Sequence, residues 1–451
     1  MSTAPSRERA SLGASSRGTT KRSAGLVIAL AFVALVFDGY DLVVYGTIVQ
    51  SILDYEAWGL TTAETGAINS LALVGMALGS LTVGYLTDLI GRRKVLIGAV
   101  AFFSVLMIAT ALAPTPELFG LFRFLAGIGL GGVIPTAVTA TVEFSRPGRK
   151  NFNNALMFSG YSVGGIIAAL LAIWLVDSIG FRGMLSIGAL PLVTILPLLI
   201  FFFPESPAYL RAKGRIAEAD RIIQQYGLAP VASAPATTAI SVTDGSPRQR
   251  NPLLAIFTGR WALITVVFLI AAIAGQILIY GLNTWLPKLL TIAGYSLTSS
   301  LTFLLVTNAG AVVGSLIASP LADRFGAKRV VSVSFALAGT ALFLMALGFL
   351  LGDGSGFPLA VTYLLVGVVG FGSIGAQILL NGFIATSYTD ATRGTALGTV
   401  LAVGRAGAAV AIVLGGALIA AELSNFVNFA VWAIPALVGS VMVLSVPRRR
   451  E

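Results

Sequence analysis

The chain has 451 residues, of which 56% are hydrophobic and 11% are charged, and its mean hydropathy is +0.91. Soluble proteins carry about 25% charged residues, so this composition excludes a soluble domain and indicates a polytopic membrane protein. Cysteine and histidine are both absent, which excludes disulfides, thiolate metal sites and proton transfer through an imidazole. We therefore expect no metal and no cofactor, and any transferred proton must bind a carboxylate.

Residues 1–23 are rich in Ser, Arg and Thr and predict a disordered cytoplasmic tail. Beyond them, apolar segments of about 20 residues are long enough to cross a bilayer. The 12 segments lie at 24–52, 64–87, 95–113, 117–140, 153–176, 184–203, 261–286, 299–320, 330–351, 358–382, 394–421 and 425–446. We expect an all-α membrane protein with six-helix bundles at 24–203 and 253–447. A cytoplasmic linker loop with a surface helix is expected between them, at 204–252.

The basic residues follow the connections between these segments. Of the 29 Lys and Arg residues, 25 lie in the termini and in the alternate connections on the same side as the termini. The opposite connections hold only Arg182 and Lys288. By the positive-inside rule, this predicts a protein of the plasma (bacterial cytoplasmic) membrane with both termini in the cytoplasm. The net charge of +10 therefore reflects topology, and we expect no nucleic-acid partner.

Two carboxylates interrupt the first apolar segment. Asp38 and Asp41 lie in FDGYDLVVYGT at 37–47, close to the expected bilayer midplane. A charge at that depth costs about 2.5–3.5 kcal/mol on insertion scales, and such residues usually mark a substrate or proton path. Their i, i+3 spacing puts both on one helix face. The pair predicts a proton-coupling site; the alternative is a structural pair clamped by Arg123 or by backbone amides around Gly39.

Two loops recur in the second half of the chain. GYLTDLIGRRK at 84–94 is matched by SPLADRFGAKR at 319–329, 235 residues further on, and EFSRPGRKN at 143–151 by YTDATRGTALG at 388–398. Such a duplication predicts two pseudo-symmetric halves. The charged residues of these loops are predicted to be latches between helices that act as gating loops: Asp88, Arg92, Arg93, Asp323, Arg324 and Arg393.

Two arginines lie inside apolar segments. Arg405 is near mid-membrane in the eleventh segment, and its guanidinium can hold a carboxylate through two parallel hydrogen bonds. We predict that it anchors a substrate anion; the alternative is a salt bridge that closes the two halves. Arg123, in the fourth segment, is predicted to belong to the substrate-binding site and to be able to pair with Asp41; the alternative is an arginine that stabilises the fold. Glu143 ends that segment and is predicted either to serve as a proton exit or to pair with the loop at 92–93.

The motifs together resemble the major facilitator superfamily, through the repeated loop, RFLAGIGLGG at 123–132 and PESP at 204–207. Four further runs resemble the aromatic acid:proton symporter family: DGYD at 38–41, GIGLGGVIPTAVT at 127–139, YGLNTWLPKLL at 280–290 and GRAGA at 404–408. The resemblance implies 12 transmembrane helices in two pseudo-symmetric bundles. It also implies import of benzoate, a hydroxybenzoate or a related aromatic carboxylate.

For the ring of such an acid, polar and aromatic side chains at helical spacing are the candidates. Gln276, Tyr280 and Asn283 follow i, i+4, i+7 and share one helix face. Tyr45 lies one turn beyond the acidic pair, and Asn381 lies in the tenth segment. The alternative for all five is ordinary core packing.

We therefore expect a monomeric symporter that uses the proton gradient to import an aromatic carboxylate across the bilayer by alternating access. The rivals are a carrier for nicotinate or an aliphatic acid, a proton/drug antiporter, a channel and an enzyme. After Gly164 and Gly165 the chain lacks the proline that follows in the antiporter motif of drug exporters. Its polar residues are too scattered for a channel pore, and it has no paired nucleophile and base for an enzyme.

Overall fold

The computed structural model describes residues 23–146, 149–228, 252–352, 356–388 and 390–447. The predicted tail, except Ser23, and the part of the linker loop at 229–251 lie outside the described residues. Every regular element among the described residues is a helix.

The helices of the first half begin at residues that favour a helix start. Thr61 and Glu64 form a capping box at the start of one helix, because each side chain accepts a hydrogen bond from the other residue's backbone amide. Another helix has Pro116 at its first position, where the missing N–H costs nothing. The elements are α1 (Ala24–Leu53), α2 (Thr62–Ile90), α3 (Arg92–Ala111), α4 (Pro116–Glu143), α5 (Lys150–Ile187), η1 (Leu190–Leu192) and α6 (Ile195–Phe202).

The second half repeats the pattern of the first. Its elements are α9 (Pro252–Ile256), α10 (Arg260–Ile292), α11 (Leu297–Phe325), α12 (Ala327–Leu351), α13 (Leu359–Ser387), α14 (Asp390–Ala420) and α15 (Asn425–Ser445). Gly91 joins α2 to α3 with φ 98°, and Gly326 joins α11 to α12 with φ 90°. Side chains rarely tolerate such angles, so each repeated loop needs its glycine. The two loops predicted to be equivalent therefore share their backbone geometry.

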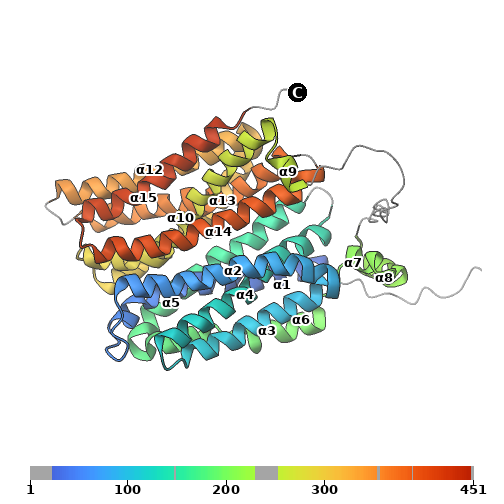
Figure 1. Ribbon diagram of the computed structural model, residues 1–451, viewed down its shortest axis with the longest axis horizontal. Coiled ribbons are helices and arrows are strands. Elements are labelled where there is room, and N and C mark those ends of the chain that lie inside the picture. Colours follow the sequence, from blue (N-terminus) through green and yellow to red (C-terminus); the bar gives the residue numbers. More distant parts are fainter. Residues whose placement is uncertain (1–22, 147–148, 229–251, 353–355, 389, 448–451) are drawn as a thin grey trace, which may run out of the picture.

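The two halves pack as pseudo-symmetric bundles, which Figure 1 shows as a blue-to-green layer and a yellow-to-red layer with roughly parallel helices. In the first bundle α1 packs mainly on α5, and α2 on α4; in the second α10 packs on α14, and α11 on α13. Between the bundles, α2 lies against α14 and α5 against α11, and α1 also contacts α10. This arrangement confirms the predicted fold.

Eleven described helices are long and apolar enough to span a membrane, and Leu190–Phe202 is a shorter apolar stretch. The segment expected as one helix at 184–203 is broken. Gly180 turns the chain within α5 with φ 60°, and the segment then passes through the end of α5, η1 and α6. Pro191 and Pro197 lie in the first turns of η1 and α6, because proline interrupts a continuing helix but is tolerated at its start.

The linker contributes α7 (Pro207–Ala212) and α8 (Ile216–Tyr226). Tyr226 of α8 is buried, and its ring lies 5.1 Å from the ring of Phe144, at the end of α4. In Figure 1 these helices lie at the same end of the bundles as α9.

The two halves are in close contact at the opposite end, near the connection between α1 and α2. There Lys288 Nζ donates to Gln50 Oε1 at 2.7 Å. A Cβ added at Gly46 would lie 1.9 Å from the backbone oxygen of Asn283, and one at Gly416 would lie 2.7 Å from that of Thr62. This end is the one that the charge pattern predicts to face the outside, so the structure is closed on the predicted outer side.

Gly39 brings α1 and α5 together beside the acidic pair. A Cβ at this position would lie 1.9 Å from the backbone oxygen of Tyr161. We expect Gly39→Ala to push the helices apart and to destabilise the protein by about 1–3 kcal/mol, as overpacking does. The thermal unfolding midpoint of the purified protein in detergent should fall. Gly98→Ala in α3 is the matched control, because a Cβ there meets no atom within 4 Å. Equal midpoints for both variants would contradict this packing argument.

Candidate functional site

Asp38 and Asp41 lie at the centre of the structure, with only 1% and 3% of their surface exposed. They face a cavity of about 20 Å³ between the two halves, which is room for about one water molecule. Its lining is formed by Asp38, Asp41, Leu42, Asn69, Ala72, Leu73, Met76, Arg123, Tyr161, Tyr280, Thr284 and Ile412. The cavity is too small to hold an aromatic ring, so the two halves enclose the predicted site tightly in this structure.

Arg123 forms an ion pair with Asp41, across α4 and α1. Its Cζ lies 5.5 Å from the centroid of the Tyr45 ring, which adds a cation–π contact. Removing one member of a buried ion pair costs about 3–5 kcal/mol, since the other charge is left without compensation. The sequence left open whether these two side chains meet; the structure brings them together at the edge of the cavity.

Asn69 and Thr284 extend this pair to the second half. Arg123 Nη2 lies 3.5 Å from Asn69 Oδ1, and Asn69 Nδ2 donates to Thr284 Oγ1 at 3.1 Å. Both residues are buried and line the cavity. The sequence reasoning missed both because uncharged polar residues are common in transmembrane helices and nothing links positions 69 and 284 along the chain.

Asp38 and Arg405 are a second buried acid and arginine close to this pair. The Asp38 Oδ2 atom is buried and has no hydrogen-bond partner among the described residues, while Arg405 and Asp41 are within electrostatic range of Asp38. Arg405 is buried in α14 and donates from Nη1 to the Met76 carbonyl of α2 at 3.1 Å. Arg405 thus contacts the opposite half through a backbone oxygen.

Two tyrosines complete the cavity wall. Tyr161 Oη of α5 donates to Tyr280 Oη of α10 at 3.1 Å, again across the halves. Asp38 and Arg405 are within electrostatic range of both phenols. Tyr280 was a candidate from the sequence, whereas Tyr161 was not, because it carries no charge and falls outside the motifs.

The other residues predicted to contact the ring of an aromatic acid are buried or partly buried, and they are not part of the cavity lining. Tyr45 donates to the Thr65 carbonyl at 2.8 Å, and Asn283 donates to the carbonyl of Ile279 and accepts from Asn308. Gln276 lies 3.1 Å from the position that a Cβ would take at Gly404, and Asn381 accepts from Gln377 at 3.3 Å. None of these four side chains lines the cavity in this structure.

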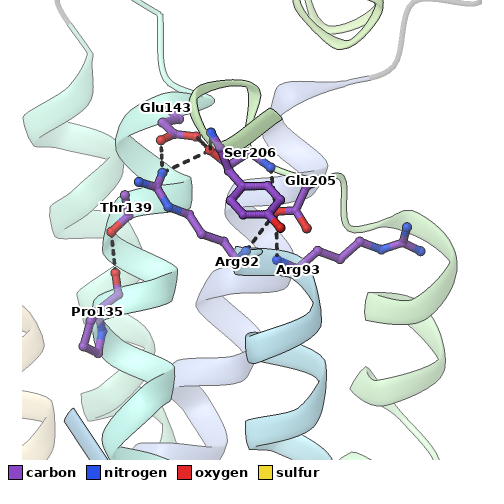
Figure 2. A network of polar contacts seen from close by, with 8 residues as sticks. Arg92, Arg93, Pro135, Thr139, Glu143, Glu205 and Ser206 are labelled. Atoms are coloured by element: carbon purple, nitrogen blue, oxygen red, sulfur yellow. Dashed lines mark hydrogen bonds and ion pairs between the residues drawn. The ribbon is translucent and has the colours of Figure 1, made fainter. Parts of the chain in front are cut away.

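Glu143 belongs to a separate polar network at the end of the first bundle that carries the linker (Figure 2). It forms an ion pair with Arg92 and accepts from the Ser206 hydroxyl at 2.6 Å. Glu205, from the PESP motif, accepts from the backbone amides of Arg92 and Arg93 at 2.9 and 3.2 Å. The network ties α3, α4 and the linker together, which favours the predicted pairing of Glu143 with this loop.

Of the other residues predicted to act in the gating loops, the structure describes the side chain of Arg324. The guanidinium of the exposed Arg324 lies 5.4 Å from the ring of its neighbour Phe325. The side chains of Asp88, Asp323 and Arg393 lie outside the described residues. Among the described residues, no three His, Cys, Asp or Glu side chains are placed to hold a metal ion.

Two pseudo-symmetric helical bundles with buried charges at their interface define a membrane transporter. The chain matches the model of the Major Facilitator Superfamily over residues 27–313 and 305–451, and it belongs to that superfamily. It is therefore a transporter and not an enzyme.

The comparisons with single proteins agree with this assignment. The chain is 37% identical to the gentisate transporter of Corynebacterium glutamicum over 96% of its own length and 88% of that protein. It is 34% identical to the benzoate transport protein of Acinetobacter baylyi, over 94% and 90%. Its fold is similar to that of the E. coli xylose transporter in a partially occluded inward-open conformation, with a TM-score of 0.75, 17% identity and coverage of 95% and 99%. These findings confirm the resemblance to aromatic acid transporters.

Proposed function

We propose that this protein is a proton-coupled symporter that imports an aromatic carboxylate, such as benzoate or a hydroxybenzoate, by alternating access. The observation that carries the proposal is the buried Asp41–Arg123 pair on a cavity between the halves, with Asp38 and Arg405 beside it. One group can exchange a proton and another can hold an anion within the same site. The relatives named for gentisate and benzoate support an aromatic acid as the substrate.

The proposed cycle starts with the halves open to the outside and a proton shared by Asp38 and Asp41. Asp38 and Asp41 lie one helix turn apart and both line the cavity, so one proton can be shared between them. The carboxylate of the substrate then binds Arg405, and the loaded carrier closes on its outer side and opens toward the cytoplasm. Neutralising the acidic pair lowers the cost of moving it through the closed state. The proton gradient is the energy source, and no cofactor takes part.

The proposed setting is the bacterial cytoplasmic membrane, with both termini in the cytoplasm and a single chain as the working unit. Both bundles of the same chain line the cavity, nine residues from the first and three from the second, so one chain contains the whole site. The basic loops support the orientation.

Uptake of labelled benzoate into vesicles, with and without an imposed proton gradient, tests the proposal. We expect an inward gradient to drive accumulation and a protonophore to abolish it. In a competition panel, benzoate, hydroxybenzoates and gentisate should compete strongly, and shikimate, which is not aromatic, should compete weakly. Stronger competition by nicotinate would assign the carrier to another organic anion. Benzoate accumulation that is the same with and without the proton gradient would rule out symport.

A further inference from the structure

A chain of buried side chains connects the Asp41–Arg123 ion pair to the opposite half of the protein. It runs from Asp41 on α1 through Arg123 on α4 and Asn69 on α2 to Thr284 on α10. The first three residues belong to the first bundle, and Thr284 belongs to the second. We propose that Asn69 and Thr284 form a bridge that transmits the protonation state of Asp41 to closure of the outer side. This inference rests on the proposed function, and it adds how the proton controls the movement.

The orientation of the Asn69 amide follows from the chemistry of its neighbours. A guanidinium only donates hydrogen bonds, so the Asn69 oxygen must face Arg123. The amide nitrogen then points to Thr284, whose hydroxyl oxygen accepts its hydrogen bond at 3.1 Å. Arg123 therefore decides which way the amide points, and only this orientation places a donor toward Thr284.

Protonation of Asp41 changes what Arg123 can bind. A carboxylate competes strongly for the guanidinium, and the contact of Arg123 with Asn69, at 3.5 Å, is the weaker of the two. In the structure Arg123 pairs with Asp41 while Asn69 donates to Thr284, and the outer side is closed. When Asp41 takes up a proton, it becomes a poorer acceptor and no longer holds Arg123 in place. The Asn69 amide then loses the partner that orients it, its bond to Thr284 loosens, and the outer side opens. When Asp41 loses its proton, Arg123 returns to it and the bridge forms again.

Other charged and titratable groups also surround the acid. On α1 these are Asp38, Tyr40 and Tyr45; the other helices that pack there contribute Arg123, Tyr161, Tyr280 and Arg405. Tyr40 donates to the Met184 carbonyl, and Tyr45 to the Thr65 carbonyl, so both hydroxyls are held within the first bundle. Tyr161 and Tyr280 also cross the halves, but they adjoin Arg405 and Asp38 rather than Arg123. The Asn69–Thr284 contact is therefore the crossing that continues from Arg123.

A single reporter thiol can measure closure of the outer side, because the natural chain has no cysteine. Ala72→Cys places the thiol on the cavity wall, where a membrane-impermeant maleimide added outside reaches it only when that side is open. In the otherwise unchanged protein, we expect acidification to speed labelling, because protonation of Asp41 loosens the bridge. Thr284→Val and Asn69→Leu should each shrink this pH effect about three- to tenfold, as expected for the loss of one buried hydrogen bond. The double variant should add nothing, because both changes break the same contact.

Two matched variants separate the bridge from a loss of packing. Thr284→Ser keeps the hydroxyl and should keep the pH effect. Thr307→Val makes the same change at a buried threonine whose hydroxyl donates within its own helix, to Phe303, and should also keep it. The proposed bridge is wrong if Thr284→Val keeps the full pH effect on labelling. It is also wrong if Thr284→Ser and Thr307→Val lose as much of this effect as Thr284→Val does. Benzoate accumulation by the unaltered protein, measured in the same vesicles, tests the proposed function separately. Its absence would reject symport whatever the labelling shows.

Discussion

Asp41→Asn is expected to abolish accumulation driven by the proton gradient while keeping some exchange of labelled for unlabelled benzoate. Asparagine has the shape of the protonated acid but cannot release a proton, so the site stays in one charge state throughout the cycle. Exchange needs only the movement of the loaded carrier, which does not require that the proton leave. The measurement compares accumulation under an imposed gradient with counterflow at equal pH, in the same vesicles.

The control for this variant is Asp177→Asn. Asp177 is an exposed carboxylate of α5 just before the turn at Gly180, outside the cavity, and its replacement should leave both rates unchanged. Loss of the Asp41–Arg123 pair also leaves a buried guanidinium without its counter-ion, which can cost about 3–5 kcal/mol. Retained counterflow shows that the protein still folds and binds. Gradient-driven accumulation at the original level in Asp41→Asn would rule out the coupling role of this residue.

The charged part of the site could be predicted from the sequence because charges stand out in apolar segments. Asp38, Asp41, Arg123 and Arg405 each interrupt a stretch that otherwise favours lipid, and the structure buries all four at the interface of the halves. The repeated loops around Gly91 and Gly326 predicted the duplication for a similar reason. A glycine turn that is flanked by charged residues and lies between two apolar segments is an uncommon pattern, so the two loops can be aligned with each other.

The neutral part of the site could not be predicted, for two physical reasons. Asn69, Thr284 and Tyr161 are ordinary residues of transmembrane helices, and only their partners on the other half distinguish them. The carbonyl of Met76, which accepts from Arg405, is a backbone atom that no residue type identifies. Contacts between groups on two different helices depend on how those helices are placed relative to each other. The periodicity of residues along one helix does not determine that placement.

Arg405→Leu is expected to weaken benzoate binding by about 10- to 150-fold, the range expected for loss of a hydrogen-bonded charge. Arg405 is buried beside the cavity, and its guanidinium now donates to the Met76 carbonyl. A substrate carboxylate is a stronger acceptor than a carbonyl and should displace that contact when the halves separate. The benzoate affinity of Arg405→Lys should lie between those of the unaltered protein and Arg405→Leu, because an ammonium keeps the charge but not the planar pair of donors. Equilibrium binding of labelled benzoate to the purified protein measures the effect.

Comparison with a neutral ligand distinguishes anion recognition from support of the fold. Benzamide has the ring of benzoate and nearly its shape but carries no charge. The unaltered protein should bind benzoate much more tightly than benzamide. Arg405→Leu should lose most of that preference, because the guanidinium that stabilises the negative charge of benzoate is removed. Arg329→Leu is the matched control, since Arg329 is exposed near the start of α12. If Arg405→Leu weakened both ligands equally, the arginine would serve to join α14 to α2, and the substrate anion would have to be held elsewhere.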